Sequence, residues 1–162
     1  MKIIFLDIDG VMVTGEYLNE LVRVDGHNFH RFAKSPVFQL NKILRETGAD
    51  IVISSSWRCD GPRWEALLDH FKLQGVEKRP IGRTPKLEKR LPSGVWLSAQ
   101  RGYEIKTWLG YGGDVESFVA IDDDSDMDDI KDNFVLVKNG MWRGGMGESH
   151  SAKAIEILMR TK

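Results

Sequence analysis

Phe5-Leu6-Asp7-Ile8-Asp9-Gly10-Val11 is the stretch that decides the fold of this 162-residue chain. It ends an apolar run that begins at Ile3, and it sets two carboxylates two residues apart. If residues 3–6 form a buried strand, that strand delivers both aspartates to its carboxyl edge, and Gly10 lets the chain turn away. Open α/β sheets bind their ligands at this edge, so we expect a ligand site here.

An ordinary turn is the alternative interpretation of Asp7 and Asp9, because Asp followed by Gly is a common turn signal. Asp7 fits this alternative poorly, since it follows large apolar residues and would bring a charge to the edge of a core. Buried charges persist only when they are paired or coordinate a metal. The rest of the chain therefore has to decide between the two interpretations.

The composition, 41% hydrophobic and 29% charged, is that of a globular protein. The length predicts one domain over residues 1–162, able to bury a core without disulfides. A net charge of -1 gives no overall attraction to nucleic acid or membranes, so only local patches would bind a polyanion. The single cysteine excludes an internal disulfide, and Asp7 ends the first apolar run too early for a signal peptide or a membrane span. These features predict a cytoplasmic protein with no membrane partner and leave its oligomeric state open.

Apolar runs alternate with segments of helical periodicity along the chain. Strands are expected at 3–6, 51–53, 118–121 and 134–137, and helices at 37–46, 63–72, 103–109 and 151–159. This alternation predicts an α/β fold with a central, mostly parallel sheet and crossover helices. Residues 11–36 suggest a hairpin or flap around Asp25-Gly26, and residues 77–101 suggest a basic loop.

Polar groups suited to phosphate chemistry follow three of the four runs, the first being the aspartate pair. The second run leads into Ser54-Ser55-Ser56-Trp57-Arg58, with hydroxyls and a guanidinium for phosphate oxygens, although a serine run by itself is usual in loops. The third leads into an acidic run from Asp122 to Asp126, a pattern that often marks a solvated face or a helix start. Because Asp122 directly follows its strand, we expect it beside Asp7 and Asp9. Carboxylates gathered there require a cation, and hard oxygen ligands favour Mg²⁺.

The order of these motifs resembles that of the haloacid dehalogenase-like (HAD) phosphohydrolases. The first family motif, Asp-x-Asp-Gly-Val/Thr after an apolar strand, is matched by residues 7–11. A serine-ended second strand, a basic residue that opens a helix and an acidic fourth motif follow in the family order over nearly the whole chain. The resemblance implies a three-layer Rossmann-like fold. It also implies a two-step phosphoryl transfer, with Asp7 as the nucleophile that forms an aspartyl-phosphate and Asp9 as the general acid and base.

A metal site is also implied by the resemblance. Mg²⁺ would be held by a carboxylate oxygen of Asp7, the backbone carbonyl of Asp9 and the fourth motif. The fourth motif is either the adjacent pair Asp122 and Asp123 or the spaced pair Asp122 and Asp126.

The family also implies groups that hold the phosphate. Ser55 is favoured as the hydroxyl of the second motif, with Ser54 and Ser56 as alternatives. Arg101 matches the basic residue of the third motif. Gly10 and Arg58 complete the expected substrate contacts, with Arg58 either a second clamp or a solvent-exposed arginine.

The intervals between the motifs are too short for a large cap domain, so the site is expected to be open and able to admit the end of a polymer. The serine motif, Arg101-Gly-x-Glu-Ile-x-x-Trp-Leu and the acidic run are most similar to the small phosphatase domains of RNA-repair proteins. Basic residues near Trp57 and Trp96 would suit a phosphate backbone and a stacked base. We therefore expect a phosphatase for nucleic-acid ends or nucleotides. A phosphatase for a small metabolite or a phosphoprotein, and a non-enzymatic module that binds Mg²⁺ or phosphate, are the alternatives.

Overall fold

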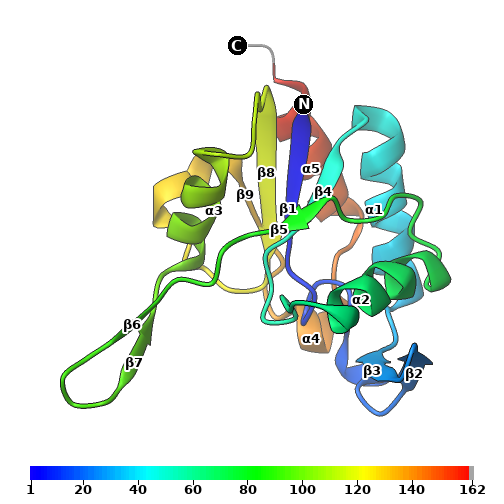
Figure 1. The fold of residues 1–162 in the computed structure, drawn as a ribbon. Helices are drawn as coiled ribbons and strands as arrows, with labels where there is room; N and C mark the ends of the chain where they lie inside the picture. Colours follow the sequence, from blue (N-terminus) through cyan, green and yellow to red (C-terminus); the bar gives the residue numbers. More distant parts are fainter. Residues whose placement is uncertain (161–162) are drawn as a thin grey trace.

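A computed structural model describes residues 1–160 as a sheet covered by helices on both faces (Figure 1). The sheet has five parallel strands in the order β5-β4-β1-β8-β9. They are β1 (Lys2–Leu6), β4 (Asp50–Ile53), β5 (Gly82–Arg83), β8 (Ser117–Asp122) and β9 (Phe134–Leu136). The chain first builds outward from β1 through β4 to β5, and then resumes on the other side with β8 and β9. The strand order therefore reverses at β1, and the crevice at the carboxyl ends of β1 and β8 is where such sheets bind ligands.

The helices divide the core into two parts. On one face pack α1 (Lys34–Thr47), α2 (Pro62–Leu73) and α5 (Glu148–Met159), and on the other α3 (Arg101–Leu109) and the 3₁₀ segment η2 (Asp128–Asn133). Along β1, Ile4 and Leu6 join the first core, whereas Ile3 and Phe5 join the second. This alternation assigns Asp7 to the face of α3. Within residues 1–160, no helix combines the length and apolarity needed to cross a membrane.

The four expected strands and four expected helices are all present, so the predicted α/β fold with a parallel sheet and no large cap is confirmed. Local signals explain the boundaries. Pro62 opens α2, where its missing N–H costs nothing, and Gly48 ends α1 with φ 70° and an N–H bonded to the Leu44 carbonyl. The short strand β5 and three short helical segments, η1 (Gly15–Tyr17), η2 and α4 (Gly140–Arg143), were not expected.

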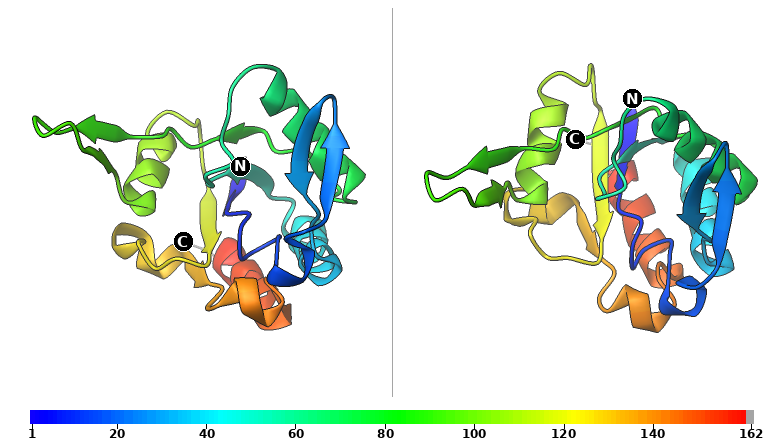
Figure 2. Two further views of the ribbon diagram at one scale, coloured as in Figure 1. Left: turned by 90° about the horizontal axis from the view of Figure 1, so that it is seen from below. Right: turned by 60° about the horizontal axis from the view of Figure 1, so that its bottom comes forward.

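Two β-hairpins lie outside the central sheet, on opposite sides of β1 when the molecule is viewed toward the carboxyl ends of its strands (Figure 2). The flap consists of β2 (Leu21–Val24) and β3 (His27–His30), joined by Asp25 and Gly26, both with positive φ as a type I′ turn requires. This confirms the expected hairpin. The arm consists of β6 (Glu88–Arg90) and β7 (Trp96–Ser98), in a segment expected to be a loop. That expectation was wrong because every residue of β6 and β7 is exposed, so no apolar alternation marks the pair.

His70 on α2 is fully buried between the rings of Phe29 and Phe32, whose centroids lie 5.0 and 4.8 Å from its own. Its Nε2 lies 3.0 Å from the His30 carbonyl oxygen. Burial lowers the pKa of His70 from 6.5 to about 4, so the folded chain keeps this imidazole neutral in mildly acidic solution.

We expect His70 to make the stability depend on pH between 6.5 and about 4. Below pH 6.5 the unfolded chain binds a proton at His70, whereas the folded chain binds it only near pH 4. Protonation therefore favours the unfolded chain, so the stability of the fold is highest above pH 6.5 and decreases as the pH falls toward 4. At about pH 4.5 the loss should reach about 2 to 3 kcal/mol. Urea unfolding at both ends of this range measures it. His70→Gln keeps an N–H donor for the His30 carbonyl and should lose less stability than the unaltered protein over this fall in pH, because the other titrating groups are common to both. An equal change in the two proteins would contradict the assignment.

Candidate active site

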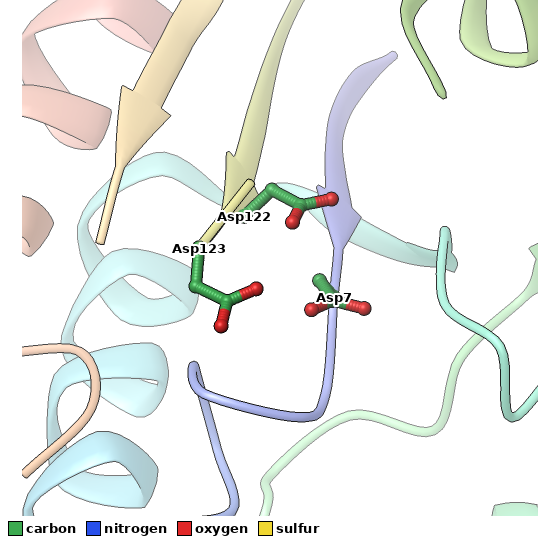
Figure 3. A group of neighbouring side chains, drawn as sticks. All are labelled: Asp7, Asp122 and Asp123. Carbon is green, nitrogen blue, oxygen red and sulfur yellow. The ribbon is translucent and has the colours of Figure 1, made fainter. Parts of the chain in front are cut away.

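Three carboxylates meet where β1 and β8 end (Figure 3). Asp7 directly follows β1, Asp122 is the last residue of β8, and Asp123 comes next; one oxygen of each lies within 4.8 Å of the others. The parallel register pairs Leu6 with Ile121 and so brings the following aspartates together. Asp7 and Asp122 are 5% and 1% exposed, so two potential charges sit almost out of water.

The environment of these carboxylates opposes their ionisation in the absence of a cation. Burial, and then the neighbouring charge of Asp122, raise the pKa of Asp7 well above its ordinary value. Burial likewise raises the pKa of Asp122 to about 7 and shifts the pKa of Asp123 upward. The Oδ2 atom of Asp122 is buried and has no hydrogen-bond partner within residues 1–160. A group of hard oxygen donors with an unsatisfied buried atom fits a divalent cation such as Mg²⁺.

The two expected forms of the fourth motif differ in their surroundings. Asp123 belongs to the carboxylate cluster. Asp126 instead accepts a hydrogen bond from the backbone N–H of Arg101 at 2.9 Å through its Oδ2, so it caps the start of α3. The geometry therefore favours Asp122 and Asp123 over Asp122 and Asp126 as the metal-binding pair.

Arg101, the first residue of α3, brings a positive charge to the cluster. Its Nη1 lies 3.4 Å from Asp7 Oδ1 and 3.8 Å from Asp122 Oδ2, and it also donates to the carbonyl of Ser54. The guanidinium thus joins the ends of β1, β8 and β4. One arginine can neutralise only part of the negative charge that the three carboxylates carry when ionised, so a further cation would be needed to balance it.

Asp9 is half-buried and lies outside the carboxylate cluster. Its Oδ2 accepts a hydrogen bond of 2.9 Å from Nε1 of Trp57. This hydrogen bond holds the carboxyl group of Asp9 in one orientation. Only the position of Trp57 in the second motif could have indicated this contact, since 48 residues separate the two side chains.

Gly10 makes room for the cluster, and its expected contact with substrate stays a prediction. Its φ of +75° suits glycine, and a Cβ there would lie 2.1 Å from Oδ2 of Asp123. Its N–H donates to the Val13 carbonyl at 2.9 Å, which argues against the expected contact between this amide and substrate. Gly140 packs on the other side, where a Cβ would lie 1.8 Å from the carbonyl oxygen of Gly10.

The three serines after β4 differ in their freedom to bind phosphate. Ser54 is buried and its hydroxyl has no partner within residues 1–160. The Ser55 hydroxyl, also buried, accepts a hydrogen bond from the Trp57 backbone N–H at 3.3 Å, and Ser56 is exposed. Val52 packs on the face of α3, so the alternation along β4 assigns Ser54 to the face that carries Asp7. The geometry favours Ser54, whereas the sequence pattern favours Ser55.

Arg58 is largely enclosed and bonded to other parts of the protein, so it is not the solvent-exposed arginine of one sequence interpretation, while its role as a phosphate clamp stays a prediction. Its Nη1 lies 2.6 Å from Oε2 of Glu104 on α3, and the two side chains are 9% and 3% exposed. Nε donates to the Ser55 carbonyl, and Nη1 also donates to Thr84 and Pro85. The other Glu104 oxygen accepts from the N–H of Leu87, at the base of the arm. Arg58 therefore ties the serine loop to α3, and neither Nε nor Nη1 is free for a phosphate.

A comparison with known families identifies the group to which these motifs belong. A model of the family described as the HAD domain in Swiss Army Knife RNA repair proteins matches residues 3–141. The chain belongs to this family. The match confirms the resemblance seen in the sequence, because it runs from β1 into α4 and covers all the motifs of this HAD domain. No curated protein and no solved structure matches the chain.

Membership in this family indicates the general class of reaction at the site. It supports a HAD-type phosphohydrolase at the level of the family, on a five-stranded α/β fold without a large cap. The acidic cluster of this HAD domain lies at the edge of the sheet where a metal-assisted phosphoryl transfer would need it.

Proposed function

We propose that this HAD domain is a Mg²⁺-dependent phosphatase that acts on nucleic-acid ends or nucleotides through an aspartyl-phosphate at Asp7. The observation that carries the proposal is the grouping of Asp7 with two further carboxylates and the guanidinium of Arg101. A nucleophile, a cation site and a fixed positive charge are the parts that phosphoryl transfer requires. The RNA-repair family supports the choice of substrate class.

The reaction divides between two aspartates. A carboxylate oxygen of Asp7 forms a bond to phosphorus while the bond from phosphorus to the leaving oxygen breaks. Asp9, held by Trp57, gives its proton to the leaving oxygen. In the second step Asp9 takes a proton from the water that attacks the aspartyl-phosphate, and Asp7 is released as a carboxylate.

The residues around Asp7 would stabilise the negative charge of the phosphate during the reaction. Asp7, Asp122 and Asp123, with the carbonyl of Asp9, would hold Mg²⁺, which would offset the repulsion between a carboxylate nucleophile and an anionic phosphate. Arg101 stabilises negative charge on the same side of the sheet. The buried hydroxyl of Ser54 donates to a phosphate oxygen.

Hydrolysis of p-nitrophenyl phosphate by the purified protein tests this function, since so small a substrate with a good leaving group can enter an open site. We expect turnover with Mg²⁺, loss of turnover after chelation, and recovery when Mg²⁺ is restored. Turnover that persists unchanged in a chelator would exclude the metal-dependent mechanism.

Ser54→Ala is expected to lower kcat/KM for p-nitrophenyl phosphate by at least about tenfold, because it removes a hydrogen bond to a charged group. Ser55→Ala should have a smaller effect, since the alternation along β4 assigns Ser55 to the face opposite to the one that carries Asp7. Steady-state kinetics of the two matched variants decides the assignment. A larger loss in Ser55→Ala would assign the phosphate-binding hydroxyl to Ser55.

A further inference from the structure

A pocket of about 250 Å³ lies between the flap and the serine loop, one side chain away from Asp9. Asn28 and His30 of β3 line it on one side, and Trp57 and Cys59 on the other. Trp57 is shared with the active site, because its Nε1 donates to Asp9. We call this space the flap pocket.

The flap pocket has a positive lining. Two arginines, Arg58 and Arg63, line it, and no carboxylate does. Arg58 is paired with Glu104. The side chain of Arg63, at the start of α2, makes no ion pair or hydrogen bond within residues 1–160. Its guanidinium instead lies over the ring of Phe29, 4.9 Å from the centroid. A free arginine beside aromatic rings suits a phosphate attached to a nucleoside.

The position of the pocket relates it to the leaving group. If Asp9 protonates the leaving oxygen, the rest of the substrate extends from the phosphorus toward the side of Asp9. Trp57 forms both the support of Asp9 and a wall of the flap pocket. A leaving group on this side therefore meets an aromatic wall first and the guanidinium of Arg63 beyond it.

We infer that the flap pocket binds the terminal nucleotide of a polynucleotide, with Arg63 on the second phosphate, the one that links this nucleotide to the next. The inference rests on the proposed phosphatase function. A polynucleotide end carries a second phosphate one nucleotide away from the terminal one. A phosphorylated serine or threonine has no second phosphate in the equivalent place, and a singly phosphorylated metabolite has none at all. Terminal phosphates at the 3′ and 5′ ends present the same chemistry, and the experiment separates them.

Substrate selectivity tests the flap pocket. Dinucleotides with a terminal 3′ or 5′ phosphate are compared with p-nitrophenyl phosphate and phosphoserine. We expect one of the two dinucleotides to have a higher kcat/KM than the other and than phosphoserine. For that dinucleotide, Arg63→Ala should lower kcat/KM about tenfold relative to kcat/KM for p-nitrophenyl phosphate. Arg23→Ala removes an exposed arginine from the same flap, outside the pocket lining, and should leave this ratio unchanged.

The outcomes separate the two proposals. If the ratio does not fall in Arg63→Ala, or falls equally in Arg23→Ala, the inferred role of the flap pocket is wrong, whereas the proposed phosphatase activity is unaffected. Absence of p-nitrophenyl phosphate hydrolysis overturns the phosphatase, and occupancy of the pocket is then judged by binding alone.

Cys59 supplies that binding measurement, because it lines the pocket and is the only cysteine in the chain. Burial raises the pKa of its thiol, so alkylation by iodoacetamide is followed at mildly alkaline pH. In an Asp7→Asn background, the preferred dinucleotide should slow alkylation several-fold, and inorganic phosphate should not. Protection that is absent, or that survives Arg63→Ala, contradicts the inference.

Discussion

Asp7→Asn is expected to leave a folded protein that hydrolyses p-nitrophenyl phosphate no faster than background, a loss on the order of 10⁴-fold or more, as when other enzymes lose their nucleophile. An amide cannot form the acyl phosphate, so the variant lacks the proposed nucleophile. The same change should raise the melting temperature without Mg²⁺, because it removes a carboxyl group that is buried beside Asp122. Activity and thermal unfolding of the same preparation measure both effects.

Asp129→Asn is the matched control. Asp129 lies on η2 in the same acidic run, but it is exposed and outside the carboxylate cluster. Its variant should retain full turnover. Mg²⁺ should raise the melting temperature of the unaltered protein and of Asp129→Asn, and raise that of Asp7→Asn less. Turnover that persists in Asp7→Asn would contradict the aspartyl-phosphate mechanism.

Glu104→Ala is expected to lower the free energy of unfolding by about 3 to 5 kcal/mol, because it leaves the charge of Arg58 buried without a counter-ion. Both side chains are nearly inaccessible to water, and Glu104 also accepts from the backbone of Leu87. Urea denaturation measures the loss.

The double variant Arg58→Met with Glu104→Ala separates the pair from the packing around it. It should be more stable than Glu104→Ala alone, since the orphaned charge is gone. Glu20→Ala breaks an exposed ion pair with Arg31 and should change stability little. A loss in Glu104→Ala as small as that in Glu20→Ala would show that the buried pair contributes no more than the exposed one.

The fold was predictable because its signals are local. Buried strands need only short apolar runs, and parallel strands end at one edge, so Asp7 and Asp122 were expected to meet before any contact was known. Arg101 was recognisable as a basic residue opening a helix. These features depend on periodicity and order along the chain, which a single sequence contains.

The remaining details depend on contacts between distant segments. Asp126 is distinguished from Asp123 only by its contact with the start of α3, and Ser54 from Ser55 only by the face on which each lies. The partnership of Arg58 with Glu104 joins residues 46 apart. No local pattern encodes such choices, since they follow from the way the two cores pack.

The contact between Gly10 and Asp123 has a consequence for the energetics of the metal site. The side chain of Asp123, in the turn after β8, lies directly against the backbone of Gly10, and Gly140 packs against the carbonyl of Gly10. Asp123 is thus confined by backbone before any cation arrives, so binding a cation would restrict little additional motion. Alanine at Gly10 would displace a ligand rather than unfold the sheet. Two positions that carry no side chain, Gly10 and Gly140, thereby shape the place proposed for the cation.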